Sequence, residues 1–158
     1  MELMYSSTRN GQVKFTASQA ILKGLADDGG LFVPEMIPTL DVSMDELTNM
    51  SYQEVAYAVM KKFFTDFTEE ELKNCINKAY DSKFDTEEIV PLKKIKDGWL
   101  MELWHGPTCA FKDIALTILP HLLKTSCRME NKKEIISILT ATSGDTGKAD
   151  RKSTRLNS

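Results

Sequence analysis

One lysine lies in a segment whose residue types suit chemistry on a carbonyl group. Residues 105–113 read HGPTCAFKD, between an apolar run and an apolar helical pattern. Lys112 stands beside Phe111 at the start of that pattern. Burial there would disfavour the charged ammonium and leave a neutral amine that can form a Schiff base with a carbonyl cofactor. The alternative is a solvated lysine in the first turn of a helix, where Asp113 favours the positive end of the helix dipole.

A second segment combines glycine, hydroxyl and acidic residues after an apolar run. Residues 141–149 read ATSGDTGKA and follow the β-branched stretch 134–141. A glycine-bearing loop that leaves a buried strand and opens a helix presents N–H groups to an anion, so we expect phosphate or carboxylate binding. A nucleotide P-loop is a weaker alternative, because Thr142 stands where that motif needs glycine and Ala149 where it needs Ser or Thr. A purely structural turn is the other alternative.

The remaining polar side chains of these segments suggest no further site. His105 alone is more often structural than catalytic, and Cys109 has no arranged base, so we interpret it as incidental. The chain has 3 cysteines and no CxxC spacing. We therefore expect no metal site and no disulfide framework, and a reducing cytoplasm fits best.

Capping boxes predict the helices of the first part of the chain. They pair Thr16 with Gln19, Ser51 with Glu54, and Thr68 with Glu71. Gly24 is placed to end the first helix, and residues 31–34 suit a short extended piece halted by proline. Behind the third box, an apolar stripe predicts a buried helix face, with Cys75 as a small core residue; it consists of Leu72, Cys75, Ile76 and Ala79.

After Pro91 the pattern changes to that of an α/β protein. Residues 92–99 suggest a hairpin with Asp97–Gly98 at its turn, and 99–104 a strand. A helical pattern follows, in which Pro120 predicts a kink or early break. With the strand expected at 134–141, this order is typical of a βαβ unit in a parallel sheet. We predict a mostly helical domain over residues 1–91 and the beginning of an α/β domain over residues 92–149.

Composition excludes several classes of protein. Hydrophobic residues make up 42% of the chain and charged residues 27%, which is the balance of a globular protein and not of a disordered one. The formal net charge of −3 gives no basic field for nucleic acid. No apolar run approaches the roughly 20 residues needed to span a membrane. The first residues are too polar for a secretory signal.

Taken together, the motifs resemble those of the threonine synthase family. Both segments above occur in that order, and three earlier stretches also match: Ser7–Arg9, Leu22–Ala26 and Asp28–Pro34. The resemblance extends from about residue 5 to residue 149. It implies a pyridoxal-phosphate (PLP) enzyme of the tryptophan-synthase-β fold type (fold type II), in which a small helical N-terminal domain precedes a parallel-sheet domain.

The resemblance also implies residue roles and a reaction. Lys112 would form the internal aldimine with PLP and then act as general base. Asp145 replaces the asparagine of relatives that read SGNTG and would lie near the cofactor. The substrate carboxylate would be bound by Thr142, Ser143, Gly144 and Thr146. The implied reaction converts O-phospho-L-homoserine and water to L-threonine and phosphate, the last step of threonine biosynthesis.

Three other functions stay open at this stage. A threonine-synthase-like phospho-lyase would share Lys112 and the loop yet release a keto acid. A phosphate-binding NTPase module would need nucleotide and magnesium but not Lys112. A non-catalytic helical interaction domain would use neither segment. The sequence does not indicate the oligomeric state.

The end of the chain differs in composition from the rest. Residues 150–158 read DRKSTRLNS, which matches the translation of a widely used sequencing adapter. We interpret them as a non-native tail after a reading frame interrupted near Ala149. The family's glycine-rich phosphate loop and the partner of the pyridine nitrogen have no counterpart in the chain. We therefore expect the 158-residue chain to be inactive and poorly folded by itself.

Overall fold

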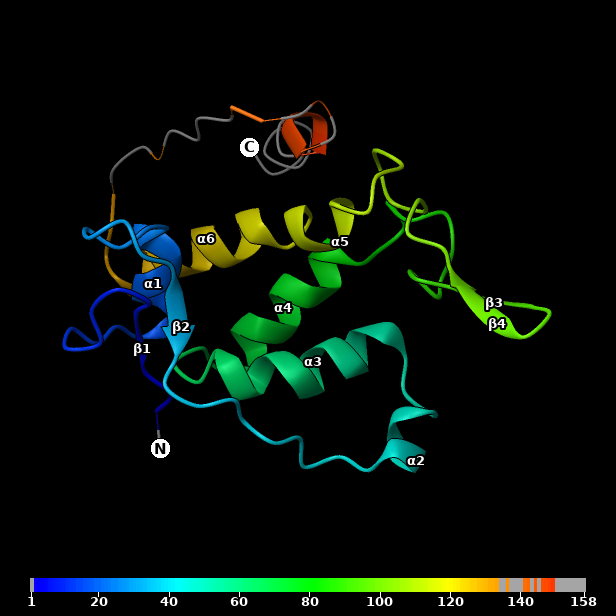
Figure 1. Cartoon of the computed structure of the whole chain (residues 1–158), viewed down its shortest axis with the longest axis horizontal. Helices are drawn as coiled ribbons and strands as arrows, with labels where there is room; N and C mark the ends of the chain where they lie inside the picture. The colour runs from blue at the N-terminus through cyan, green and yellow to red at the C-terminus, as the bar shows by residue number, and fades with distance from the viewer. Residues whose placement is uncertain (1, 134–135, 137–140, 143, 145, 150–158) are drawn as a thin grey trace. The chain divides into compact units, whose positions relative to one another are not determined.

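The computed structural model describes residues 2–133, 136, 141, 142, 144 and 146–149 (Figure 1). It combines helices with two small sheets, which confirms a mixed α/β composition. The described chain divides into two compact units, one with residues 2–75 and 122–133 and one with residues 76–121 and the described residues after 134. The predicted domain boundary near Pro91 concerns family domains and stays a prediction.

In the first unit, a short sheet joins two stretches from near the N-terminus. Strand β1 (Tyr5–Ser7) pairs antiparallel with β2 (Phe32–Pro34), so that Tyr5 lies opposite Pro34. Strand β2 confirms the predicted extended piece before Pro34, whereas β1 was not predicted. The Phe15 and Phe32 rings pack edge to face, with their centroids 4.9 Å apart, so β2 also contacts the residue that precedes helix α1 (Ala17–Lys23) by two positions.

All three predicted capping boxes are present. They open α1 (Ala17–Lys23), α3 (Tyr52–Phe63) and α4 (Glu69–Ala79). Gly24 ends α1 with a φ of 70°, a conformation that glycine adopts without steric cost. A fourth box, which pairs Ser43 with Glu46 and opens α2 (Met44–Leu47), was missed by the sequence analysis.

The predicted stripe of α4 is buried. Leu72, Cys75 and Ile76 are each 1% exposed, and Ala79 is fully buried. The Cys75 thiol lies 3.4 Å from the hydroxyl of Thr125, in helix α6 (Leu119–Met129). This confirms the interpretation of Cys75 as a core residue.

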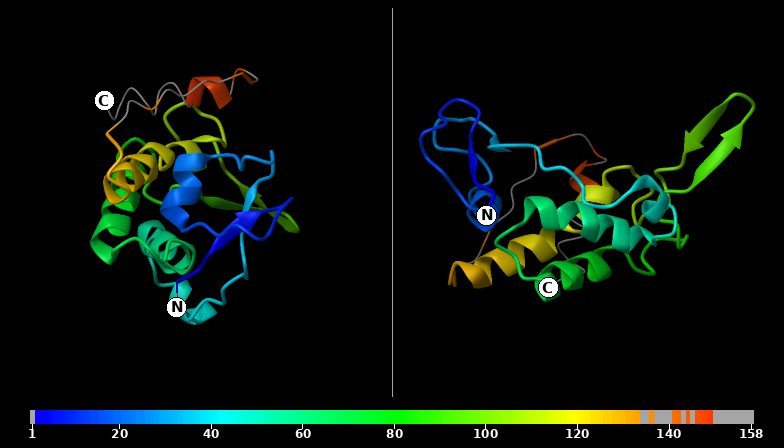
Figure 2. Two further views of the ribbon diagram at one scale, coloured as in Figure 1. Left: turned by 90° about the vertical axis from the view of Figure 1, so that its left-hand side faces the viewer. Right: turned by 90° about the horizontal axis from the view of Figure 1, so that it is seen from below.

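In the second unit, the predicted hairpin is formed by β3 (Leu92–Ile95) and β4 (Gly98–Met101). Its turn is Lys96–Asp97 and not Asp97–Gly98, because Gly98 already pairs with Ile95. The strand expected over 99–104 ends at Met101. Figures 1 and 2 show the hairpin standing clear of α5 (Asp113–Leu116), the short helix of the same unit.

Pro120 interrupts the helical pattern as predicted. Helix α5 ends at Leu116, and α6 begins at Leu119, so Pro120 occupies the second position of the new helix. There its missing N–H costs nothing, because the first N–H groups of a helix have no partner within it.

The predicted parallel sheet depends on residues 134–141, most of which lie outside the described residues. Both sheets of the described part of the chain are two-stranded and antiparallel. No helix among the described residues is long and apolar enough to cross a membrane. The three cysteines form no disulfide.

Candidate active site

Lys112 directly precedes helix α5. Its backbone is already helical, with φ −61° and ψ −24°, and its side chain is half-buried. The Nζ atom lies 5.0 Å from the centroid of the Phe111 ring, and that ring is 57% exposed. The apolar shielding expected at Lys112 is therefore only partial in this chain. No described carboxylate forms a salt bridge with Lys112, so its amine is not held by an ion pair there.

The next residue, Asp113, is fully buried. One carboxylate oxygen accepts the backbone N–H of Thr108 at 2.7 Å, and the other accepts the Thr108 hydroxyl at 2.6 Å. Thr108 is itself 5% exposed. A buried carboxylate is costly unless hydrogen bonds compensate its lost hydration, and Thr108 supplies two of them.

Gly106 leaves room for that carboxylate. A Cβ atom at Gly106 would lie 2.5 Å from Cβ and 2.6 Å from Oδ2 of Asp113, closer than nonbonded atoms approach. The N–H of Cys109 donates to the Gly106 carbonyl at 3.0 Å, and Cys109 has a φ of 57°. The segment 106–113 is therefore a tight turn folded around one acidic side chain.

His105 is held between two carboxylates. Its Nε2 lies 2.9 Å from Glu102 Oε2, and its Nδ1 lies 2.5 Å from Asp85 Oδ1. The hydrogen bond to Glu102, followed by the one to Asp85, raises the pKa of His105 above its ordinary value of 6.5. The backbone N–H of Asp85 also donates to the His105 carbonyl at 3.1 Å. His105 thus ties residues 85 and 102 to the start of the motif, which is a structural role.

Part of the second motif lies near this turn. Lys148 Nζ donates to the Thr108 carbonyl at 3.4 Å, which links the two motifs through one residue. Thr142 and Gly144 are exposed, and Thr146 is half-buried. Gly144 and residues 146–149 are helical, as expected for a loop that opens a helix. The predicted site residues Ser143 and Asp145 lie outside the described residues.

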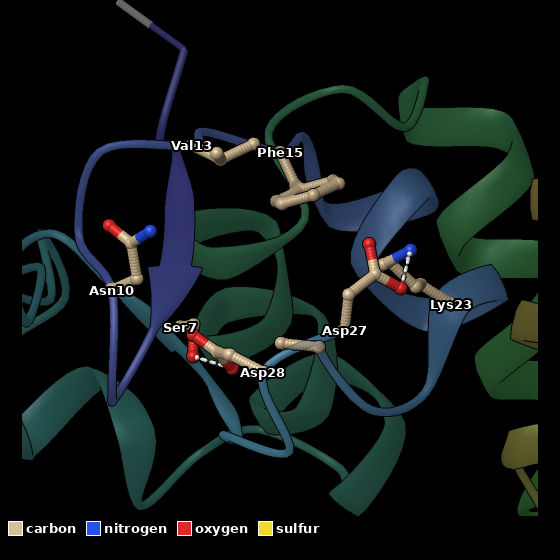
Figure 3. A pocket seen from close by; sticks show the side chains of 8 residues that line it. Ser7, Asn10, Val13, Phe15, Lys23, Asp27 and Asp28 are labelled. Carbon is tan, nitrogen blue, oxygen red and sulfur yellow. Dashed lines mark hydrogen bonds and ion pairs between the residues drawn. The ribbon is translucent and has the colours of Figure 1, made fainter.

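The N-terminal motifs form a separate corner of the first unit (Figure 3). Ser7 Oγ donates to Asp28 Oδ1 at 2.7 Å, and the N–H of Gly30 donates to the same oxygen at 2.8 Å. These two bonds, the Ser7 bond first, lower the pKa of Asp28. Arg9 Nη1 donates to the Asp28 carbonyl at 2.9 Å. A cavity of about 120 Å³ lies beside this corner, and the charged side chains that line it are already paired, Lys23 with Asp27 and Asp28 with Ser7. The corner fastens β1 to the turn before β2.

Lys112 was predicted from the sequence, but the roles of its neighbours Asp113 and Gly106 were not. Asp113 was expected only to favour a helix N-terminus, and Gly106 was given no role. The residue types carried a usable signal, because Gly, Thr and Asp together supply space, donors and an acceptor within eight residues of one another.

Comparison with known proteins gives one consistent family. Residues 4–80 match the model of the threonine synthase N terminus. A threonine synthase of Schizosaccharomyces pombe is 40% identical over 94% of this chain, which covers 30% of that relative. The crystal structure of the yeast threonine synthase gives a TM-score of 0.85 at 35% identity, over 96% of this chain and 33% of that one.

A second solved structure, that of PLP-bound threonine synthase from Brucella melitensis, also gives a TM-score of 0.85, at 32% identity, with the same coverage. The chain thus spans about a third of the length of the relatives that it matches. Residues 4–80 therefore match the N-terminal domain of the threonine synthase family.

Proposed function

We propose that the full-length protein containing this chain is a PLP-dependent threonine synthase, a lyase that converts O-phospho-L-homoserine and water to L-threonine and phosphate. The observation that carries the proposal is the position of Lys112 in the HGPTCAFKD motif, directly before helix α5 and next to the buried Asp113 that anchors the motif to Thr108. The solved structure of the Brucella melitensis threonine synthase, a third of which matches this chain, is PLP-bound, which supports that cofactor here.

The residues of the site fit such a cofactor. A cofactor aldehyde needs a lysine amine whose backbone is held while its side chain stays available, and Lys112 meets both conditions. When bound, PLP supplies an electron sink for charge that develops at the substrate Cα. The finer fold, a fold-type-II PLP domain with a parallel sheet that begins near residue 92, belongs to the same proposal.

Lys112 has two tasks in the proposed reaction, and the loop residues have one each. Lys112 holds the cofactor, and its Nζ takes and returns the proton at the substrate Cα. Thr142, Ser143, Gly144 and Thr146 bind the substrate carboxylate, and Asp145 lies beside the cofactor. A Cβ at Gly144 would meet no atom within 4 Å in the described structure, so the loop backbone there is accessible to a ligand. The absence of disulfides suits a cytoplasmic enzyme.

Borohydride reduction in the presence of PLP, followed by peptide mapping of the full-length protein, tests the proposal. We expect the reduced cofactor on Lys112, and Lys112→Ala should abolish both the label and threonine formation. A label on another lysine would refute the assignment. Product analysis separates the related alternative, because a phospho-lyase would release a keto acid instead of threonine. Nucleotide binding that survives Lys112→Ala would favour an NTPase module, and no chromophore with PLP would favour an interaction domain.

A further inference from the structure

We propose that Asp113 is the positioning residue of Lys112, and that Thr108 is the group through which it acts. This inference rests on the proposed function of Lys112 and adds the reason why its side chain leaves the backbone in one defined direction. The buried carboxylate of Asp113 fastens the turn 106–108 to the first turn of α5, and Lys112 lies between these two fastened points.

The geometry of the carboxylate supports a positioning role over a capping role. A capping carboxylate at a helix start accepts N–H groups of the helix that it opens, whereas each carboxylate oxygen of Asp113 accepts a hydrogen bond from Thr108, five residues earlier. Both oxygens are therefore used to hold the preceding turn. Gly106 completes the arrangement, because any side chain there would occupy the place of the Asp113 carboxylate.

The backbone leaves Lys112 little freedom once the carboxylate is in place. Cys109 N–H donates to Gly106, and Asp113 N–H donates to Ala110, both at 3.0 Å, so two consecutive turns cover residues 106–113. Rotation about the backbone of Lys112 would carry Asp113 away from Thr108 and leave a buried charge without its donors. The Cα–Cβ direction of Lys112 is thereby fixed.

Thr108 also connects this turn to the second motif. Its carbonyl accepts Lys148 Nζ at 3.4 Å, while its N–H and hydroxyl serve Asp113. All three of its polar groups are thus engaged, two with Asp113, which follows Lys112 directly, and one with Lys148 of the second motif. A disturbance at Thr108 should displace both parts of the site.

Matched substitutions in the full-length protein test this inference. Thr108→Val removes the hydroxyl donor and keeps the shape, and Thr108→Ser restores the donor. Thr117→Val is the control, because Thr117 is also buried and donates to Asp113, but to its backbone carbonyl at 2.7 Å. The readout is borohydride-trapped PLP on Lys112, measured by peptide mapping relative to the exposed Lys78.

We expect Thr108→Val to lower the ratio of label at Lys112 to label at Lys78 about tenfold, the effect of one lost hydrogen bond to a charged group. Thr117→Val should leave the ratio within about twofold, and Thr108→Ser should restore it. Equal loss in the two valine variants, or no rescue by serine, would show a general loss of stability and overturn the inference.

Amide hydrogen exchange provides an independent test that needs neither the cofactor nor a variant. The Thr108 N–H donates to a buried carboxylate, so its protection in the unsubstituted protein should equal that of amides inside α6. Exchange at the rate of an open loop would overturn the inference. If Lys112 takes no more PLP than Lys78 while the Thr108 amide is protected, the proposed function fails and the anchored turn stands.

Discussion

Helix α4 and the β3–β4 hairpin both carry large apolar side chains in the spacing that their secondary structure requires, and they differ in what covers those side chains. On α4, Leu72 and Ile76 are each 1% exposed. On the hairpin, Ile95 is 53% and Trp99 is 65% exposed, and all four residues of β3 are exposed. The apolar pattern is similar, but only the helix finds its partners within the described chain.

This difference shows that pattern and burial are separate properties. A 3.6-residue period exposes the polar face of α4 and buries the other, whereas the hairpin exposes apolar residues on both faces. Two strands alone are marginally stable in water, so the hairpin contributes little to the stability of this chain. The turn 106–113 and the hairpin just before it differ in the same way. The turn is packed around the buried Asp113, whereas the apolar side chains of the hairpin are exposed.

The largest effect should come from equal substitutions in the two elements. Leu72→Ala removes a fully packed side chain and should lower the free energy of unfolding by about 2–5 kcal/mol. Leu100→Ala in β4, where the side chain is 42% exposed, should change it by about 0.5 kcal/mol or less. Urea unfolding followed by circular dichroism measures both. Similar losses in the two variants would mean that the hairpin is covered after all.

Glycine substitutions test the difference in packing between the turn 106–113 and the hairpin. Gly106→Ala places a Cβ against the Asp113 carboxylate and should cost about 1–3 kcal/mol of unfolding free energy. Gly98→Ala is its control, because a Cβ there would lie 3.9 Å from the Ile95 carbonyl oxygen, an ordinary contact. We expect less than about 0.5 kcal/mol for Gly98→Ala. Thermal unfolding of the two variants would refute the tight turn if Gly106→Ala were as stable as Gly98→Ala.

Removal of helix caps should also affect stability more in a packed helix than in an exposed one, but by a smaller amount. Ser51→Ala removes the cap of the twelve-residue α3 and should cost about 1 kcal/mol. Ser43→Ala removes an identical box from the four-residue α2, which has no buried residue, so unfolding of the whole protein should hardly change. The test is the urea midpoint of each variant. Equal shifts would show that α2 is part of the cooperative unit.

The elements that the sequence predicted are those decided by neighbours along the chain. The boxes at Thr16, Ser51 and Thr68, the stripe of α4 and the break at Pro120 each depend on residues within a few positions. Pairing between β1 and β2 was not predicted, because their partners are far apart in the sequence. The hairpin turn was predicted one residue too far along the chain, because Lys96 adopts the positive φ of 38° and Gly98 already pairs with Ile95.

The candidate site was predictable at Lys112 and not around it. The lysine was recognisable from its motif. Asp is rarely fully buried, so its residue type argues against the buried, turn-anchoring role that Asp113 has. His105 was considered alone because Asp85, one of its two partners, lies 20 residues earlier in the sequence. The roles proposed for Ser143 and Asp145 stay predictions, because these residues lie outside those described.

The smallest expected effect is the change of stability with pH that arises from His105 and its two carboxylate partners. Hydrogen bonds to Glu102 and Asp85 raise the pKa of His105 above 6.5 in the folded chain. Below about pH 6.5 the histidine is protonated in both the folded and unfolded states, and the stabilisation is fully present. As pH rises further, the unfolded state loses its proton first, so stability falls until pH passes the folded-state pKa. The urea midpoint, measured from pH 5.5 to 9, should therefore decrease over this window.

Substitution of each histidine isolates the group responsible. His105→Gln removes the titrating ring, so its urea midpoint should be lower at pH 5.5 and should lack the His105-dependent decrease above pH 6.5. His121→Gln leaves the pair intact and should keep that decrease. If His105→Gln followed the same pH profile as the unsubstituted protein, the bridge between residues 85, 102 and 105 would not hold this part of the turn, and the anchoring would fall to Asp113.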